Sequence, residues 1–160
     1  MPYTDLQKQV YDNKIKRGFN VTDIGKEIIL MTEELGELCD AKLSNDKGAI
    51  IDAIGDIMVY CLSMSSLFKW DAHDIIEEVT FSGDYLTHIG REIGMLAKTF
   101  KKSNQQSVDK IDRRAEFKSH LGKLLGYCKA AFFAEGSNEL AILKGIVENN
   151  SVRSHQGKIK

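Results

Sequence analysis

Two aspartates stand inside an otherwise uncharged stretch between Ala49 and Phe68. Asp52 and Asp56 are four residues apart and would share one face of a helix, where two like charges destabilise each other. The rest of the stretch is apolar nearly all round, as expected of a helix buried on most sides, so both carboxylates are expected to point inward. Ionised carboxylates in a dry environment need a metal ion or a basic partner. The pair therefore indicates a functional site, with a salt bridge between helices as the structural alternative.

The preceding stretch of the chain contributes three more acids, Glu33, Glu34 and Glu37. At about 100° per residue these glutamates fall within one sector of a helix. Two adjacent antiparallel helices would bring up to five carboxylates to a common region, and hard oxygen ligands in that number suit Mg²⁺ or Mn²⁺. For the three glutamates alone, the alternative is a solvated acidic helix face.

The elements that must position these acids are predicted to be helices throughout. Pro2 is the only proline, and apolar residues recur at every third and fourth position, which predicts an all-α protein. Thr4, Thr22, Asp46 and Asp71 are the expected N-caps of the first four helices. The predicted helices cover roughly 4–17, 22–43, 46–70, 71–78, 85–102, 109–133 and 137–148, with 103–107 as a polar connector.

A weak internal repeat relates an acidic hairpin, about 22–70, to a second hairpin, about 84–134. TEELGELCDAKLSND aligns with GREIGMLAKTFKKSN, and GDIMVYCLSM aligns with GKLLGYCKAA. Glu34 meets Glu92 in this alignment, but the other acids meet different residue types: Glu37 faces Met95, Asp40 faces Lys98, Asp52 faces Ser119 and Asp56 faces Lys123. A chance match between amphipathic helix pairs is the alternative. A true duplication predicts a single domain over 1–160 with one acidic site and a more basic second half.

Composition and missing motifs exclude several classes of function. The 22 Lys and Arg against 23 Asp and Glu leave a net charge of -1, so no global positive field exists to hold nucleic acid or an anionic membrane. The N-terminus is polar from the start and the three cysteines form no C-x-x-C pair, so a cytoplasmic protein with reduced thiols is expected. The sequence contains no Glu-x-x-His pair, P-loop, Rossmann glycine motif or H-E-x-x-H.

The run EIILMTEELGELCDAKLSND, followed by IIDAIGDIMVYCLSM, closely resembles the MazG-like superfamily of all-α nucleoside triphosphate pyrophosphohydrolases, which includes the dimeric dUTPases. The superfamily signature is E-E-x-x-E, a variable gap, then E-x-x-D. Glu33, Glu34 and Glu37 match its first part, and Asp56 matches its final Asp. Ala53 stands at the penultimate acid, and Asp52, one residue earlier, is the expected replacement. The strong resemblance covers roughly residues 9–70.

This resemblance implies Mg²⁺-dependent hydrolysis of a (deoxy)nucleoside triphosphate to the monophosphate and pyrophosphate, with Mn²⁺ as a possible substitute. It implies that the metal is held by four acids and that Glu33 is the catalytic base that orients the attacking water. The four expected metal ligands are Glu34, Glu37, Asp52 and Asp56. The segment IVENNSVRS is similar to one that holds nucleotide in some members. The expected substrate contacts are Asn150 and Arg153 in that segment, with Lys98 and Lys123 from the second hairpin.

Two other functions stay open. One is the related phosphoribosyl-ATP pyrophosphatase of histidine synthesis, against which the longer chain and the second hairpin argue. The other is a catalytically silent nucleotide-binding or oligomerisation bundle, motivated by the displaced Asp52. A homodimer is expected because most soluble oligomers are symmetric dimers. The preferred base and sugar depend on pocket walls that no motif reveals.

Overall fold

The computed structural model describes residues 1–103 and 113–152 of the chain. Within those ranges it contains seven helices and no strand, which confirms the predicted all-α class. The helices are α1 (Pro2–Arg17), α2 (Ile24–Leu43), α3 (Lys47–Leu67), α4 (Ala72–Ile75), α5 (Tyr85–Ser103), α6 (Arg114–Ala134) and α7 (Glu139–Val152).

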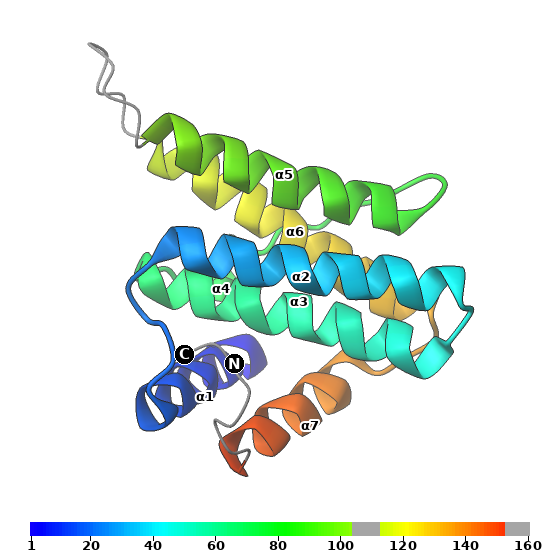
Figure 1. The fold of residues 1–160 in the computed structure, drawn as a ribbon, viewed down its shortest axis with the longest axis horizontal. Helices are drawn as coiled ribbons and strands as arrows, with labels where there is room; N and C mark the ends of the chain where they lie inside the picture. The colour runs from blue at the N-terminus through cyan, green and yellow to red at the C-terminus, as the bar shows by residue number, and fades with distance from the viewer. Residues whose placement is uncertain (104–112, 153–160) are drawn as a thin grey trace.

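Two helical hairpins form two adjacent layers of the molecule (Figure 1). One consists of α2 and α3 and the other of α5 and α6, and they pack together through α2 against α5 and α3 against α6. Helices α1 and α7 pack on the opposite side of α3, while α4 lies against α1 and α6. The two hairpins of the predicted repeat thus lie side by side, with α1 and α7 added on one flank.

The N-terminal caps of these helices only partly follow the sequence prediction. Asp46 and Asp71 cap α3 and α4 as predicted, each carboxylate accepting a backbone N–H. The predictions for the first two helices were wrong. Helix α1 begins at Pro2 because proline is preorganised for the first turn, and the Thr4 hydroxyl instead donates to the Asp71 carboxylate at 2.9 Å. Asp23, not Thr22, caps α2.

Three predicted helix ends also differ from the structure. Helix α4 stops at Ile75 instead of 78, because the backbone then extends and the Glu77 N–H donates to the Gly122 carbonyl on α6. Helix α3 ends at Leu67 instead of 70, where Lys69 adopts a left-handed conformation. Helix α7 continues to Val152. The expected connector after residue 103 and the expected helix start at 109 lie outside the described residues.

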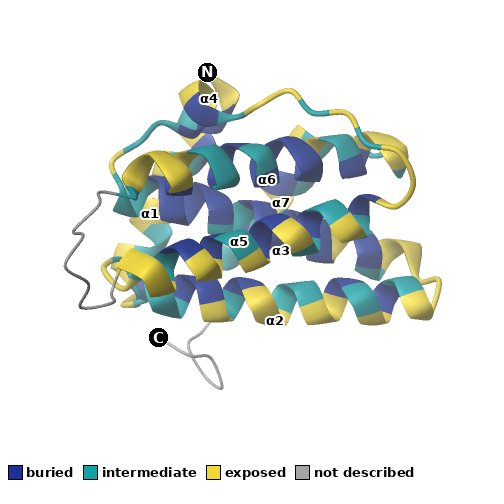
Figure 2. Ribbon diagram, turned by 90° about the horizontal axis from the view of Figure 1, so that it is seen from above, coloured by how far each residue is buried: buried dark blue, intermediate teal, exposed yellow. Residues whose placement is uncertain are grey.

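The core is built around α3, the most apolar helix. Eleven of its 21 residues are buried, including Ile54, Ile57, Met58 and Leu62. Figure 2 shows buried residues on the inward faces of the helices and exposed ones on the outward faces. By length and composition alone α3 could cross a membrane, but 61% of its apolar window is buried inside the fold. This burial is typical of the core helix of a soluble protein.

Residues 75–79, which begin at the last residue of α4, cross α6 in direct backbone contact, and we call this segment the strap. Two glycines one turn apart on α6 allow that contact. A Cβ atom placed on Gly122 would lie 2.2 Å from the Ile75 carbonyl oxygen, and one on Gly126 would lie 2.1 Å from the Glu77 carbonyl oxygen. Backbone atoms cannot move aside as a flexible side chain can, so only glycine fits at these two positions.

We predict that Gly126→Ala lowers the free energy of unfolding by about 3 kcal/mol, because the added methyl group overlaps the strap backbone. Gly94→Ala is the matched control, since a Cβ atom at this exposed position on α5 meets nothing within 4 Å. The control should keep or slightly raise stability, as alanine favours helix over glycine. Urea denaturation followed by circular dichroism measures both variants. Equal stability of the two would contradict the tight contact.

Candidate metal site

Three carboxylates from two helices converge on one side of the α2–α3 hairpin. Glu34 and Glu37 are three residues apart and share a face of α2, while Asp56 projects from α3. One oxygen from each of the three carboxylates lies within 4.8 Å of the other two. Glu37 is exposed, and Glu34 and Asp56 are half-buried, so the cluster opens to solvent on one side. These three acids, called the acidic cluster below, have a separation suited to one divalent cation.

The electrostatics of the cluster favour a cation. Burial, then the neighbouring carboxylates of Asp56 and Glu37, raise the pKa of Glu34 to about 8. One oxygen of Glu34, Oε2, is buried without a hydrogen-bond partner within the described part of the chain. Burial and, after it, the charges of the same acids raise the pKa of Tyr60, one turn after Asp56, well above its ordinary value. Oxygen donors alone, one of them buried and unsatisfied, fit Mg²⁺ or Mn²⁺.

Asp52 lies outside the acidic cluster. Its side chain is exposed, so the prediction that both acids of α3 point inward was wrong for this residue. The reason is the rotation of the helix: Ala53 is only 3% exposed and takes the inward position, which leaves Asp52 on the outward flank. Glu33, the predicted base, is exposed on α2 beside the cluster, and its charge contributes to the raised pKa of Glu34.

The predicted substrate contacts are spread over three helices. Lys98 is exposed on α5, Lys123 is half-buried on α6 and Asn150 is half-buried near the end of α7. Arg153 lies outside the described residues. The roles of these four residues stay predictions.

A buried polar network two helical turns from the cluster was not predicted from the sequence. Lys14 of α1 donates to Glu27 of α2 and, at 2.6 Å, to the Ser63 hydroxyl of α3. Ser63 in turn donates to the same Glu27 oxygen at 3.1 Å. Glu27 is fully buried and Lys14 is only 11% exposed. The available signal was the position of these polar residues on the apolar faces of their helices, with Glu27 seven residues before Glu34.

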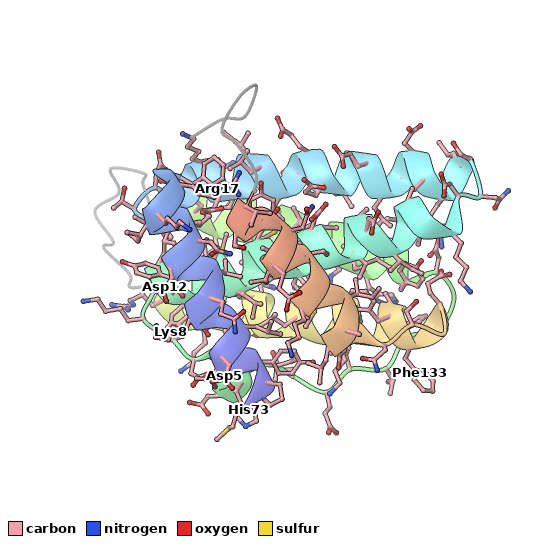
Figure 3. All side chains as sticks on the ribbon, turned by 90° about the horizontal axis from the view of Figure 1, so that it is seen from below. Asp5, Lys8, Asp12, Arg17, His73 and Phe133 are labelled. Atoms are coloured by element: carbon pink, nitrogen blue, oxygen red, sulfur yellow. The ribbon has the colours of Figure 1, made fainter. Side chains whose placement is uncertain are left out.

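This network fixes the hairpin that carries the acidic cluster. Glu27 and Glu34 lie two turns apart on α2, and Ser63 and Asp56 lie two turns apart on α3. Figure 3 looks onto the face where α1 and α7 cover α3. On α7, the Ile146 side chain reaches the position that a Cβ atom on Gly55 would fill, directly beside Asp56. Contacts from α1, α2 and α7 therefore fix the part of α3 that carries Asp56.

Part of the chain is similar to one known protein family. The model of the phosphoribosyl-ATP pyrophosphohydrolase family matches residues 7–82, just under half of the chain, and the match contains α1 from residue 7 onward and all of α2, α3 and α4. That family belongs to the MazG-like all-α superfamily, so the resemblance seen in the sequence is supported at this level. No curated protein matches the chain. No solved structure matches it either.

The match supports pyrophosphohydrolase chemistry on a nucleotide and leaves the exact substrate open. It contains all three acids of the cluster and the Lys14 network. It does not reach the hairpin of α5 and α6 or helix α7. Similarity to the dimeric dUTPases in particular is not supported by this match.

We predict that Lys14→Met lowers the free energy of unfolding by about 3 kcal/mol, because it leaves the fully buried Glu27 carboxylate without its cation. Lys8→Met is the matched control. Lys8 also pairs with an acid on α1, Asp12 at 2.7 Å, but both side chains are on the outer surface of the helix (Figure 3). The control should leave Tm unchanged. A Lys14→Met protein as stable as the control would contradict the structural role of this pair.

We also predict that the metal-free protein loses stability as pH rises from about 4.5 to 8. Over this range the unfolded chain ionises Glu34 while the folded chain keeps it protonated, because its folded pKa is raised to about 8. The measurement is Tm in chelator at pH 5 and pH 8 for the wild type and for Glu34→Gln. Between pH 5 and pH 8 the Tm of the wild type should fall further than the Tm of the variant. Mg²⁺ should raise the wild-type Tm at pH 8 and so remove this difference. Parallel losses in both proteins would exclude this origin.

Proposed function

We propose that this chain hydrolyses the anhydride bond between the α and β phosphates of a nucleotide, in a reaction that depends on a divalent metal. The observation that carries the proposal is the convergence of Glu34, Glu37 and Asp56 within the segment that matches a pyrophosphohydrolase family. Mg²⁺ is the proposed ion and Mn²⁺ a substitute, since all the donors are carboxylate oxygens.

The proposed division of labour follows from exposure and position. Glu34, Glu37 and Asp56 would hold the metal, which, when bound, neutralises phosphate charge and lowers the pKa of water. Glu33 is exposed on the same helix next to these acids and would accept the proton of the attacking water. The water oxygen bonds to phosphorus, the bridging oxygen leaves with pyrophosphate, and a nucleoside monophosphate unit remains. Asp52, from the outward flank of α3, would act only at the edge of the site.

Two substrates are proposed, in order. The family match favours phosphoribosyl-ATP, which would give phosphoribosyl-AMP and pyrophosphate. It outweighs the argument from chain length, because the matched segment alone carries the whole acidic cluster. A (deoxy)nucleoside triphosphate is the second candidate. The observation in its favour is the additional α5–α6 hairpin, which packs along α2 and α3 outside the matched segment.

Three further proposals concern the substrate contacts, the state of the protein and its partners. The proposed contacts to the anionic or sugar parts of the nucleotide are Asn150 and Arg153, from the sequence resemblance, and Lys98 and Lys123, which replace acids in the second hairpin. A cytoplasmic homodimer is the proposed state of the protein. Neither nucleic acid nor membrane is a proposed partner, given the net charge of -1.

The test is to incubate the protein with phosphoribosyl-ATP and with each canonical (d)NTP, in Mg²⁺ or in chelator, and to resolve all phosphate-containing products. We expect metal-dependent release of pyrophosphate, not of single phosphate, from one or a few of these nucleotides. Orthophosphate release would show that the wrong bond was assigned. Nucleotide binding without any product would favour the silent bundle.

Variants of neighbouring acids sharpen this test. Glu37→Gln and Asp56→Asn should each lower kcat at least about 100-fold, because each removes a ligand of the metal that stabilises charge in the transition state. Asp40→Asn, at an exposed position one turn after Glu37, is the matched control and should keep activity. The fold decrease in kcat caused by Asp52→Asn should be less than about a tenth of the fold decrease caused by Asp56→Asn. Full activity in the first two variants would refute the metal site.

A further inference from the structure

The second hairpin holds a buried carboxylate of its own. Glu92 on α5 is fully buried, and its Oε2 lies 2.7 Å from Nδ1 of His120 on α6. Since the acceptor in this pair is taken to be the carboxylate oxygen, Nδ1 of His120 is assigned as the donor. The other oxygen of Glu92, Oε1, has no hydrogen-bond partner within the described residues. The Arg91 guanidinium approaches this oxygen no closer than 3.8 Å. A single histidine therefore supplies most of the compensation for this buried acid.

The positions of this pair correspond to those of the acidic cluster. In the internal alignment Glu92 takes the place of Glu34, His120 that of Ala53 and Lys123 that of Asp56. The packing agrees with this correspondence, since α5 and α6 pair as α2 and α3 do, and each helix packs against its counterpart. Glu34 meets an acid across its hairpin, whereas Glu92 meets the imidazole of His120.

The faces of the two hairpins are also covered differently. Gly55 on α3 corresponds to Gly122 on α6. Gly55 is approached by the end of a side chain, Ile146 of α7, whereas Gly122 is in contact with strap backbone and accepts a hydrogen bond from the Glu77 N–H at 3.1 Å. Further along the same segment, the ring of Phe81 packs near Tyr85 and His88. The strap therefore closes the face of the second hairpin that corresponds to the α7 side of the first.

We propose that the α5–α6 hairpin contains a closed, metal-free counterpart of the acidic cluster. In it His120, and not a divalent ion, binds the Glu92 carboxylate. Residues 1–103 and 113–152 then offer one metal site, on the first hairpin. The second hairpin gains a fixed link between α5 and α6 that needs no ion, and so gives a rigid surface against which α2 and α3 pack. Lys123, at the position of Asp56, adds positive charge where a metal ligand would be needed.

The first experiment counts bound metal with Mn²⁺ as the probe, using electron paramagnetic resonance of the free ion on the full chain. Wild type and His120→Ala should bind the same number of Mn²⁺ ions, and Asp56→Asn should weaken Mn²⁺ binding at least tenfold without leaving a second saturable site. Saturable binding that survives Asp56→Asn but disappears in Asp56→Asn/His120→Ala would overturn the inference. An inactive protein with these binding counts would refute the proposed function only.

The second experiment compares two replacements of His120 by thermal unfolding in chelator. His120→Ala leaves Glu92 buried without a donor and should lower Tm by about 10 °C. His120→Asn places an amide N–H near the position of Nδ1 and should recover at least half of that loss. Equal losses in the two variants would show that the donor to Glu92 is not what matters.

Discussion

Repulsion between carboxylates is the constraint around which this fold is organised. Glu34, Glu37 and Asp56 have oxygens within 4.8 Å of one another, and like charges so close oppose the pairing of α2 with α3. The hairpin nevertheless stays closed because α3 is buried along most of its length. The Lys14 network adds a polar link that ties α1, α2 and α3 together two turns from the acids. Apolar burial and the Lys14 network thus hold three carboxylates together at the place where we propose that a metal ion binds.

The two hairpins resolve the burial of an equivalent glutamate in different ways. On the first, Glu34 is half-buried and faces other acids, which raises its pKa, so its ionised form needs an external cation. On the second, Glu92 is fully buried and its hydrogen-bond partner comes from the chain itself, through Nδ1 of His120. One arrangement is open to solvent and fits a ligand, and the other is closed under the strap. The difference explains how a nearly symmetric bundle supports a single proposed site.

The family match covers the residues proposed to carry out the reaction, but not the helices expected to determine substrate preference. The matched residues, 7–82, contain the acidic cluster and the helices that fix it, so the bond that is broken is best argued from this part. Helix α7 and the α5–α6 hairpin lie outside the match and pack directly on the helices that carry the acids. Any preference for base or sugar that distinguishes this chain is therefore expected to come from these additions.

The sequence by itself determined the helical class, most helix positions and the acids of the cluster, because periodicity and spacing are local properties. It also predicted that both acids on α3 point inward, which was wrong for Asp52. Asp52 and Asp56 are equivalent by spacing, and only the packing of Ala53 into the core turned Asp52 outward. The links of Lys14 to Glu27 and of Glu92 to His120 join residues 13 and 28 positions apart. Such pairs depend on how helices lie against each other, which local spacing does not encode and tertiary packing alone decided.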